Sequence, residues 1–344
     1  MRVLVTGHHG YLGSVLAPIL RDAGHDVVGL DCFLYEGCDF GDDAPFEPAL
    51  RVDVRDVAPE TLAGFDAVVH LAALSNDPLG DLDPAWTFSI NLHATVALAR
   101  AARAAGVRTF VFASSCSIYG TADAGALVSE ESALRPLTPY AESKVRAEAE
   151  LARLADGRFA PVSMRNATAY GLSPRLRLDV VLNNLVAWAH TTGAIRLLSD
   201  GLSWRPLVHV RDIARATLAI LEAPPEAIAG EAFNIGAQDQ NYLIRDLADL
   251  VRRRFPECEV TYASDASPDP RSYRVDFSKF ASAFPAFRFE HSAERAVDEL
   301  ADAYARADLT LADFEGHRYV RLNHLRRMLA EGVLDGDLRR PAPA

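Results

Sequence analysis

The stretch RVLVTGHHGYLG, residues 2–13, places a short apolar run directly before three evenly spaced glycines. The run Arg2–Thr6 predicts a buried strand, and Tyr11–Ala23 predicts the helix that follows it. The glycines allow a sharp turn between the two and let a pyrophosphate approach the backbone, while the helix N-terminus offers free N–H groups. The cofactor contacts predicted in this strand–turn–helix unit are Gly7, Gly10, Tyr11, Leu12 and Gly13.

The same alternation of strand and helix continues through the first half of the chain. Further strands are predicted at Asp26–Asp31, Leu50–Val54, Ala67–Leu71, Thr109–Ser114 and Pro161–Asn166, and further helices at Pro84–Ala105 and Pro139–Ala155. Repeated strand–helix–strand units predict an α/β fold, a doubly wound parallel sheet with helices on both faces (a Rossmann fold).

Prolines interrupt the second half, which we expect to form a smaller α/β lobe. Its expected helices are Asp179–His190, Asp212–Glu222, Ile244–Phe255, Ser292–Ala305 and His317–Glu331. We expect residues 1–166 to form the dinucleotide-binding domain, with 203–236 returning to it, and 167–202 and 237–344 to form the lobe. The Arg/Pro/Ala-rich end from Leu338 is expected to fray.

Composition narrows the classes of function. The chain has 344 residues, 49% of them hydrophobic, and a net charge of −12 at pH 7. An acidic chain lacks the basic surface that nucleic acid needs, so we expect no nucleic-acid partner. The four cysteines show no zinc spacing, which predicts no metal. The first apolar run is too short for a signal peptide, and no segment approaches the ~20 apolar residues of a membrane span. We expect a cytoplasmic protein without membrane contact.

A carboxylate at the end of the second strand indicates which dinucleotide binds. Asp31 lies eighteen positions after Gly13, where its side chain can accept hydrogen bonds from the adenine ribose and would repel a 2′-phosphate. This favours NAD over NADP as the cofactor. Asp53 and Val54, after the third strand, are expected to flank the adenine.

Tyr140 and Lys144 stand four residues apart at the start of a predicted helix, with Thr138 as its cap. That spacing puts both side chains on one helical face. A nearby ammonium group stabilises a phenolate and lowers its pKa, which would make Tyr140 a usable general base. The chain has only two lysines, Lys144 and Lys279, so the pairing is unlikely to arise by chance.

Small hydroxyl residues follow the fifth predicted strand, in the run ASSCSIYG at 113–120. A doubly wound sheet presents such residues to a ligand at its carboxyl edge. Ser115 is one of the serines in this run that can hydrogen-bond a substrate hydroxyl while Tyr140 removes its proton.

Together these motifs resemble the extended short-chain dehydrogenase/reductases, in particular their nucleotide-sugar epimerase/dehydratase group. The matching pieces are Thr6–Gly13, Asp31, Asp53–Val54, His70–Ala73, Asn91, Ser114–Gly120 and Tyr140–Lys144, in family order up to about Gly171. The resemblance implies NAD as cofactor and a nucleoside-diphosphate sugar as substrate. It gives Lys144 a further role on the nicotinamide ribose and adds Leu71, Ala72, Ala73 and Asn91 as cofactor contacts.

Weaker matches to the group's substrate lobe occur in the second half. They are Asn183–Leu185, the segment Trp204–Asp212, Phe233–Gly236 and Arg271. Arg205 and Arg271 can neutralise a diphosphate in an otherwise acidic protein. The substrate contacts that we expect are Ser75, Cys116, Ser117, Asn166, Asp179, Asn184, Arg205 and Arg271.

The residues after Ser115 bear on the reaction. Sugar 4,6-dehydratases carry Asp-Glu there, and uronate decarboxylases often carry Glu, whereas this chain has Cys116-Ser117. Three reactions stay open: an epimerase that transiently oxidises a ring hydroxyl, ranked first; a ketoreductase of a 4-keto sugar; and a base-assisted epimerisation beside a ketone, with Cys116, Ser117 and Asp179 as candidate acid and base. A non-catalytic nucleotide sensor or scaffold is the alternative of another class.

The helices Pro84–Ala105 and Pro139–Ala155 form the dimer interface in the proteins that the chain resembles. Both are rich in alanine here, which permits close packing of helices. We therefore expect a homodimer.

Overall fold

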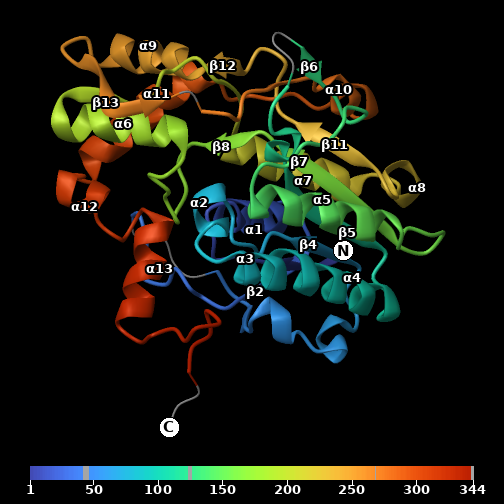
Figure 1. Ribbon diagram of the computed structural model, residues 1–344. Coiled ribbons are helices and arrows are strands. Elements are labelled where there is room, and N and C mark those ends of the chain that lie inside the picture. The colour runs from blue at the N-terminus through green and yellow to red at the C-terminus, as the bar shows by residue number, and fades with distance from the viewer. Residues whose placement is uncertain (42–45, 123–125, 268, 342–344) are drawn as a thin grey trace.

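The computed structural model describes residues 1–41, 46–122, 126–267 and 269–341. Its centre is a seven-stranded, fully parallel sheet with the order β11-β7-β5-β4-β1-β2-β3 (Figure 1). The order runs outward in both directions from the first strand, so the doubly wound parallel sheet is confirmed. The strands are β1 (Arg2–Thr6), β2 (Asp26–Asp31), β3 (Ala49–Arg51), β4 (Ala67–His70), β5 (Thr109–Ser115), β7 (Ala160–Asn166) and β11 (Ala232–Ile235).

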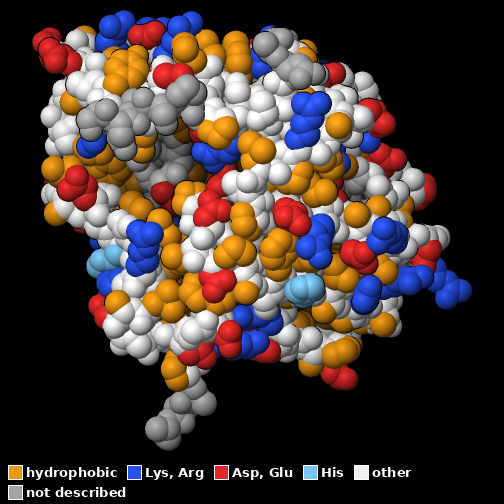
Figure 2. All heavy atoms as spheres, viewed as in Figure 1, with side chains coloured by type: hydrophobic (Ala, Val, Ile, Leu, Met, Phe, Trp, Pro, Cys, Tyr) orange, Lys and Arg blue, Asp and Glu red, His pale blue; other side chains and the backbone are white. Residues whose placement is uncertain are grey.

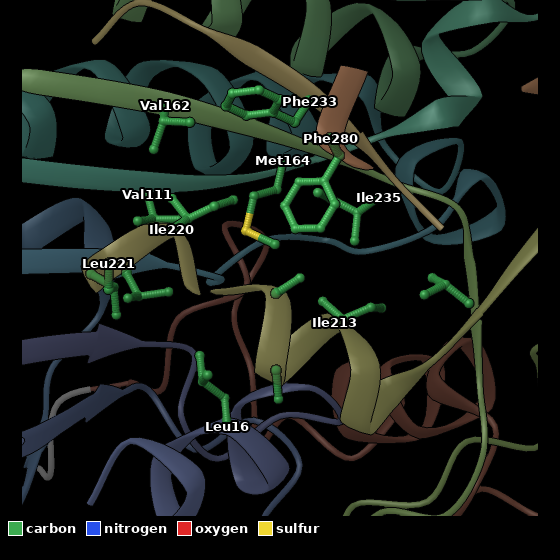
Figure 3. Packing of buried hydrophobic residues seen from close by; sticks show 14 of the residues in the cluster. Leu16, Val111, Val162, Met164, Ile213, Ile220, Leu221, Phe233, Ile235 and Phe280 are labelled. Carbon is green, nitrogen blue, oxygen red and sulfur yellow. The ribbon is translucent and has the colours of Figure 1, made fainter. Parts of the chain in front are cut away.

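Helices bury both faces of this sheet. Alternate side chains of β1 belong to two different cores, with Val3 and Val5 on one face and Leu4 on the other. The first core includes side chains of α1 (Gly13–Asp22) and α7 (Val210–Glu222), and Figure 3 shows Leu16, Ile213 and Ile220 of these helices near strand residues such as Val111 and Met164. The second face carries α3 (Pro84–Thr87), the π-helical turn η3 (Phe88–Ala94), α4 (Thr95–Ala104) and α5 (Pro139–Ala152).

The second half builds a third core around α6 (Val181–Thr192), α9 (Ile244–Arg254), α11 (Ala293–Arg306) and α12 (Leu311–Glu315). Three small sheets accompany it: β8 (Thr168–Tyr170) with β10 (Trp204–His209) and β12 (Asn241–Leu243); β9 (Ala194–Ser199) with β13 (Glu259–Ser267); and β6 (Leu127–Val128) with β14 (Arg274–Val275). Short helices at Val54–Asp56 (η1), Pro59–Leu62 (η2), Asp77–Gly80 (α2), Cys116–Tyr119 (η4), Pro225–Ile228 (α8) and Ser278–Ala283 (α10) complete the described elements.

The C-terminal region returns to the N-terminal half of the molecule. Side chains of α13 (Arg321–Ala330) share a core with Leu4 of β1, and Figure 1 shows α13 below the upper lobe, beside the blue N-terminal segments. Leu338 is only 2% exposed. The Arg55 side chain donates a hydrogen bond to the Asp337 carbonyl, and the Arg340 side chain donates one to the Phe33 carbonyl. The fraying expected from Leu338 is therefore wrong for residues 338–341, and the end of the expected 237–344 lobe packs on the dinucleotide-binding half.

The stretch 203–236 divides between the two halves. Its strand β11 joins the large sheet beside β7, and its helix α7 packs on the same core as α1, but β10 pairs with β8 and β12. In the part of the chain that the structure describes, no helix is long and apolar enough to cross a bilayer. On the face in Figure 2, basic and acidic side chains are interspersed.

Candidate active site

A cavity of about 430 Å³ lies where the carboxyl ends of the parallel strands meet the second half of the chain. This is where ligands bind in open doubly wound sheets. Most of the site residues predicted from sequence line it, although they come from segments up to 260 positions apart. These residues are Gly7, Gly10, Tyr11, Leu12, Gly13, Asp31, Asp53, Val54, Leu71, Ala72, Ala73, Ser75, Ser115, Ser117, Tyr140, Lys144, Asn166, Asp179, Arg205 and Arg271.

The glycine loop between β1 and α1 has no room for side chains. Gly7 has a φ of +73°, and a Cβ there would lie 2.7 Å from the Ala72 backbone nitrogen. A Cβ on Gly13 would overlap the Gly7 carbonyl oxygen. The Tyr11 hydroxyl donates a 2.8 Å hydrogen bond to the Gly171 carbonyl and ties the loop to the second half. The bare backbone beside a helix N-terminus fits a dinucleotide diphosphate.

Asp31 is fixed at the carboxyl end of β2. Its carboxylate accepts hydrogen bonds from the backbone N–H groups of His9, at 3.1 Å, and Phe33, at 2.8 Å. Burial nevertheless raises the pKa of Asp31. Burial also acts to raise the pKa of Asp53, but the hydrogen bonds from Arg55 outweigh it and leave that pKa lowered. Both carboxylates line the cavity, where Asp31 is expected to bind the adenine ribose and Asp53 to flank the adenine.

Tyr140 and Lys144 project from the first turns of α5, which Thr138 caps by accepting a 3.2 Å hydrogen bond from the Ala141 N–H. The Lys144 ammonium donates a 2.7 Å hydrogen bond to the Ala113 carbonyl at the end of β5. Burial raises the pKa of Tyr140 to about 12, although a hydrogen bond with Ser115 works against this rise. Burial also lowers the pKa of Lys144 to about 7. In the free protein, burial therefore outweighs the expected lowering of the Tyr140 pKa by the lysine.

Several polar groups around Tyr140 are arranged toward a ligand. The Ser117 hydroxyl donates a 2.9 Å hydrogen bond to the Ser115 oxygen, which orients Ser115. Ser114 and Asn166 also line the cavity, and the Ser114 hydroxyl and the Asn166 amide oxygen have no hydrogen-bond partner among the described residues. Buried polar groups are seldom left unpaired, so these two atoms indicate a polar ligand.

The two arginines expected to hold a diphosphate are brought together by an acid that sequence reasoning missed. Asp269 accepts from Arg205, at 2.6 Å, and from Arg271, at 2.8 Å, and Arg271 also pairs with Asp77. Asp77 in turn accepts a 2.6 Å hydrogen bond from the Thr138 hydroxyl at the cap of α5. The arrangement links Arg205 and Arg271 to α5, the helix that carries Tyr140 and Lys144.

A second arginine–carboxylate pair lies deeper in the cavity. Arg177 makes a two-point contact with Asp179, at 2.9 and 3.0 Å, and donates to the Ser75 hydroxyl at 3.1 Å. Asp179 and Ser75 were predicted as substrate contacts, whereas Arg177 was missed. The available signal was the alternation RLRLD at 175–179, which puts two basic residues and an acidic one at alternate positions.

Three predicted residues do not line the cavity. Cys116 begins a short helix after Ser115, and its thiol is buried and donates to the Arg165 carbonyl. The Asn184 amide donates to the Leu178 carbonyl, at 2.8 Å. These positions correct the expectation that Cys116 and Asn184 contact substrate. Asn91 is fully buried and bonds to both backbone groups of Leu74, so it shapes the cavity wall without facing the cofactor space.

His70, which is part of the sequence resemblance, connects β1 and α4 behind the cavity. Its ring bonds to the hydroxyls of Thr6, at 2.7 Å, and Thr95, at 2.8 Å, and burial lowers its pKa to about 3. Within the described ranges, no three or more His, Cys, Asp or Glu side chains gather in a way that could hold a metal ion.

Comparison with known proteins agrees with this geometry. Residues 3–236 match the model of the NAD dependent epimerase/dehydratase family. A UDP-glucose 4-epimerase from Mycolicibacterium smegmatis is 32% identical over 248 residues, which cover 69% of this chain and 77% of that protein. A dTDP-glucose 4,6-dehydratase from Streptomyces griseus is 30% identical over 290 residues, covering 80% and 86% of the two chains.

A solved structure extends the likeness to three dimensions. MoeE5 in complex with UDP-glucuronic acid and NAD is 27% identical, with a TM-score of 0.77, and the match covers 89% of this chain and all of that one. The glycine loop, the ribose carboxylate and the Tyr140–Lys144 pair fit the same cofactor. The chain belongs to the NAD dependent epimerase/dehydratase family of the extended short-chain dehydrogenase/reductases, and it is an NAD-dependent enzyme.

Proposed function

We propose that this enzyme epimerises a nucleoside-diphosphate sugar by transient oxidation of a ring hydroxyl. The observation that carries the proposal is that one cavity is lined by the bonded Tyr140–Ser115 pair, by the arginines Arg205 and Arg271, and by the glycine loop. A diphosphate on the arginines would bring an attached sugar toward the tyrosine. The names of the relatives, UDP-glucose 4-epimerases among them, support the same substrate class.

The residues of the chain handle the proton in this reaction. The Ser115 hydroxyl aligns the substrate hydroxyl, and the Tyr140 oxygen accepts its proton. To accept it, Tyr140 must start as a phenolate, which the Lys144 ammonium stabilises. NAD, when bound, would supply the hydride chemistry at the same carbon. The oxidised sugar then turns its other face toward the cofactor. Tyr140 returns the proton, so no net oxidation or reduction occurs.

The surroundings of Ser115 favour epimerisation over dehydration. Elimination of water needs an acid and a base beside the ketone, whereas the two residues after Ser115 are a buried thiol and a hydroxyl. Among the described residues, four carboxylates line the cavity. Asp31 and Asp53 are the two expected around the adenosine of the cofactor, and Asp77 and Asp179 are each paired with an arginine. The burial of Cys116 also removes one of the candidates for base-assisted epimerisation.

The test is turnover of a panel of UDP-, dTDP-, GDP- and CDP-sugars by the purified protein, followed by chromatography and NMR of the sugar. We expect one substrate to equilibrate with its epimer without consumption of added NADH. Stoichiometric consumption of NADH with a 4-keto sugar would identify the ketoreductase instead. Binding of NAD and a sugar nucleotide without conversion of any member of the panel would support the sensor.

We also propose that the protein is a cytoplasmic homodimer. The helices expected at its interface already contact one another within the chain, because η3 and α4 pack against α5. This intramolecular packing accounts for the buried alanines Ala102, Ala141 and Ala147. Light scattering at micromolar concentration tests the dimer, and a monomer mass would rule it out.

A further inference from the structure

Arg321, at the start of α13, is a buried cation that faces the cofactor cavity. Its side chain is 2% exposed and lines the cavity with Leu34 and Tyr35. One terminal nitrogen, Nη2, donates a 3.0 Å hydrogen bond to the Arg175 carbonyl, and the guanidinium lies 4.0 Å from the centre of the Tyr35 ring. The other terminal nitrogen, Nη1, is buried without a hydrogen-bond partner among the described residues.

Neighbouring arginines differ from Arg321 because each forms an ion pair with a carboxylate. Arg175 pairs with Asp39, and Arg177 pairs with Asp179. Among the described residues, no carboxylate oxygen lies within 4 Å of the Arg321 guanidinium. A buried, unpaired charge is strongly unfavourable, and burial accordingly lowers the pKa of Arg321. A guanidinium in this position needs an anion to balance its charge and to accept a hydrogen bond from Nη1.

The position of Arg321 selects among the anions that the cavity can hold. Tyr35, on which the guanidinium stacks, follows β2 and its ribose carboxylate Asp31 by four residues. α13 packs through Leu325 and Met328 on the core of the dinucleotide-binding half. The expected substrate diphosphate, in contrast, has its own arginines beside Asp269.

We propose that Arg321 binds the diphosphate of the NAD cofactor and adds a C-terminal anion-binding group to the glycine loop. Arg177 lines the same cavity, but its charge is balanced by Asp179, whereas the charge of Arg321 has no such partner among the described residues. The match to the family model ends at residue 236, 85 positions before Arg321. The cofactor site of this chain therefore includes a residue outside the segment that defines its family.

Binding measurements on the full-length chain, stripped of cofactor, test this role without any turnover. ADP-ribose probes the diphosphate, adenosine probes the nucleoside alone, and UDP probes the substrate side. Arg321→Gln keeps an N–H donor for the Arg175 carbonyl but removes the charge. We expect it to weaken ADP-ribose binding by about tenfold or more, as loss of a charge-assisted hydrogen bond does, with adenosine and UDP affected less than twofold.

The control variant is Arg326→Gln, on the exposed side of the same helix, which should bind all three ligands as the wild type does. Arg321→Met is the second charge-removing variant, in case Arg321→Gln does not fold, and the same loss of ADP-ribose affinity is expected from it. Unchanged ADP-ribose affinity in a folded variant would overturn the proposal. So would a loss confined to UDP, which would place Arg321 on the substrate. None of these results depends on whether the enzyme is an epimerase.

Discussion

The Lys144 ammonium nitrogen lies 5.8 Å from the centre of the Tyr140 ring, and a 2.7 Å hydrogen bond to the Ala113 carbonyl fixes it there. The two residues are one helical turn apart on α5, but it is a strand carbonyl that sets the direction of the lysine. The relative position of Tyr140 and Lys144 thus depends on the contact between α5 and β5 as well as on their i, i+4 spacing.

Tyr140→Phe should abolish epimerisation and leave cofactor binding largely intact. The substitution removes only the hydroxyl that is expected to exchange the proton, and the buried residue keeps the Cβ and backbone that pack beside Gly80. We expect kcat to fall by 100-fold or more, in the ~10²–10⁴ range for loss of a general base, while the NAD dissociation constant changes less than threefold. A near-normal rate would show that another group removes the proton.

Lys144 should make the free energy of unfolding depend on pH between about 7 and 10.5. Its pKa is about 7 in the folded protein and 10.5 as the ordinary value, so between these values the unfolded state binds more protons at this site. The free energy of unfolding therefore rises with pH across this window. Lys144→Met lacks the contribution, so its Tm relative to that of the wild type should be highest near pH 7 and fall toward pH 10.

Differential scanning fluorimetry without cofactor measures this trend. The loss of the hydrogen bond to Ala113 offsets the Tm of Lys144→Met by a similar amount at every pH. The quantity to compare is therefore the slope of the Tm difference between variant and wild type against pH. Lys279→Met, at the partly exposed lysine that pairs with Glu231, is the matched control and should show a smaller slope. A pH-independent difference for Lys144→Met would mean that the lysine stays protonated in the folded state.

Local patterns predicted residues that line one cavity, because each pattern acts within a few residues. The glycine loop, the carboxylate that ends β2 and the i, i+4 pair on α5 all follow from backbone geometry near one another in sequence. Their meeting in one cavity follows from the doubly wound topology, which brings the carboxyl ends of the strands to one edge.

Contacts made across the chain were beyond these patterns. Ser115 and Cys116 are adjacent, yet one faces the cavity and the other faces Arg165, because a short helix turns the chain between them. Arg321 carries no motif, and only the return of α13 to the first half brings it to the cofactor cavity. Proline and arginine near Leu338 indicated a frayed end, but packing of that leucine overrides composition.

Arg271→Met should weaken substrate binding and spare the cofactor. Arg271 is held by Asp269 and Asp77 in the free protein, ready to exchange these carboxylates for a diphosphate. We expect UDP affinity to fall by about tenfold and ADP-ribose affinity to change less than twofold, in titrations of the full-length chain. Arg252→Met, at an exposed arginine paired with Asp249, is the control. Equal losses for both ligands would indicate a general disturbance of the cavity.

Leu338→Ala should destabilise the protein and loosen the cofactor end of the cavity. The Leu338 side chain is buried in the core that contains Leu4 and Leu30 and also lines the cavity. Its backbone has a φ of 56°, a left-handed conformation that a leucine keeps only when its surroundings hold it. We expect a loss of about 2 kcal/mol or more of unfolding free energy, measured by urea titration, and weaker NAD binding. Unchanged stability would mean that the C-terminal segment is detached in solution.

Gly13→Ala should prevent cofactor retention through a single methyl group. A Cβ at this position would overlap the Gly7 carbonyl oxygen and the backbone of His8, which cannot move without opening the turn between β1 and α1. Gly157→Ala is the matched control, because a Cβ there meets no atom within 4 Å and the residue does not have a left-handed φ. We expect the Gly13 variant to purify without NAD and to bind ADP-ribose at least tenfold more weakly, whereas Gly157→Ala keeps wild-type affinity. Wild-type affinity in the Gly13 variant would show that the loop does not carry the diphosphate, which would leave Arg321 and the adenine contacts to hold the cofactor.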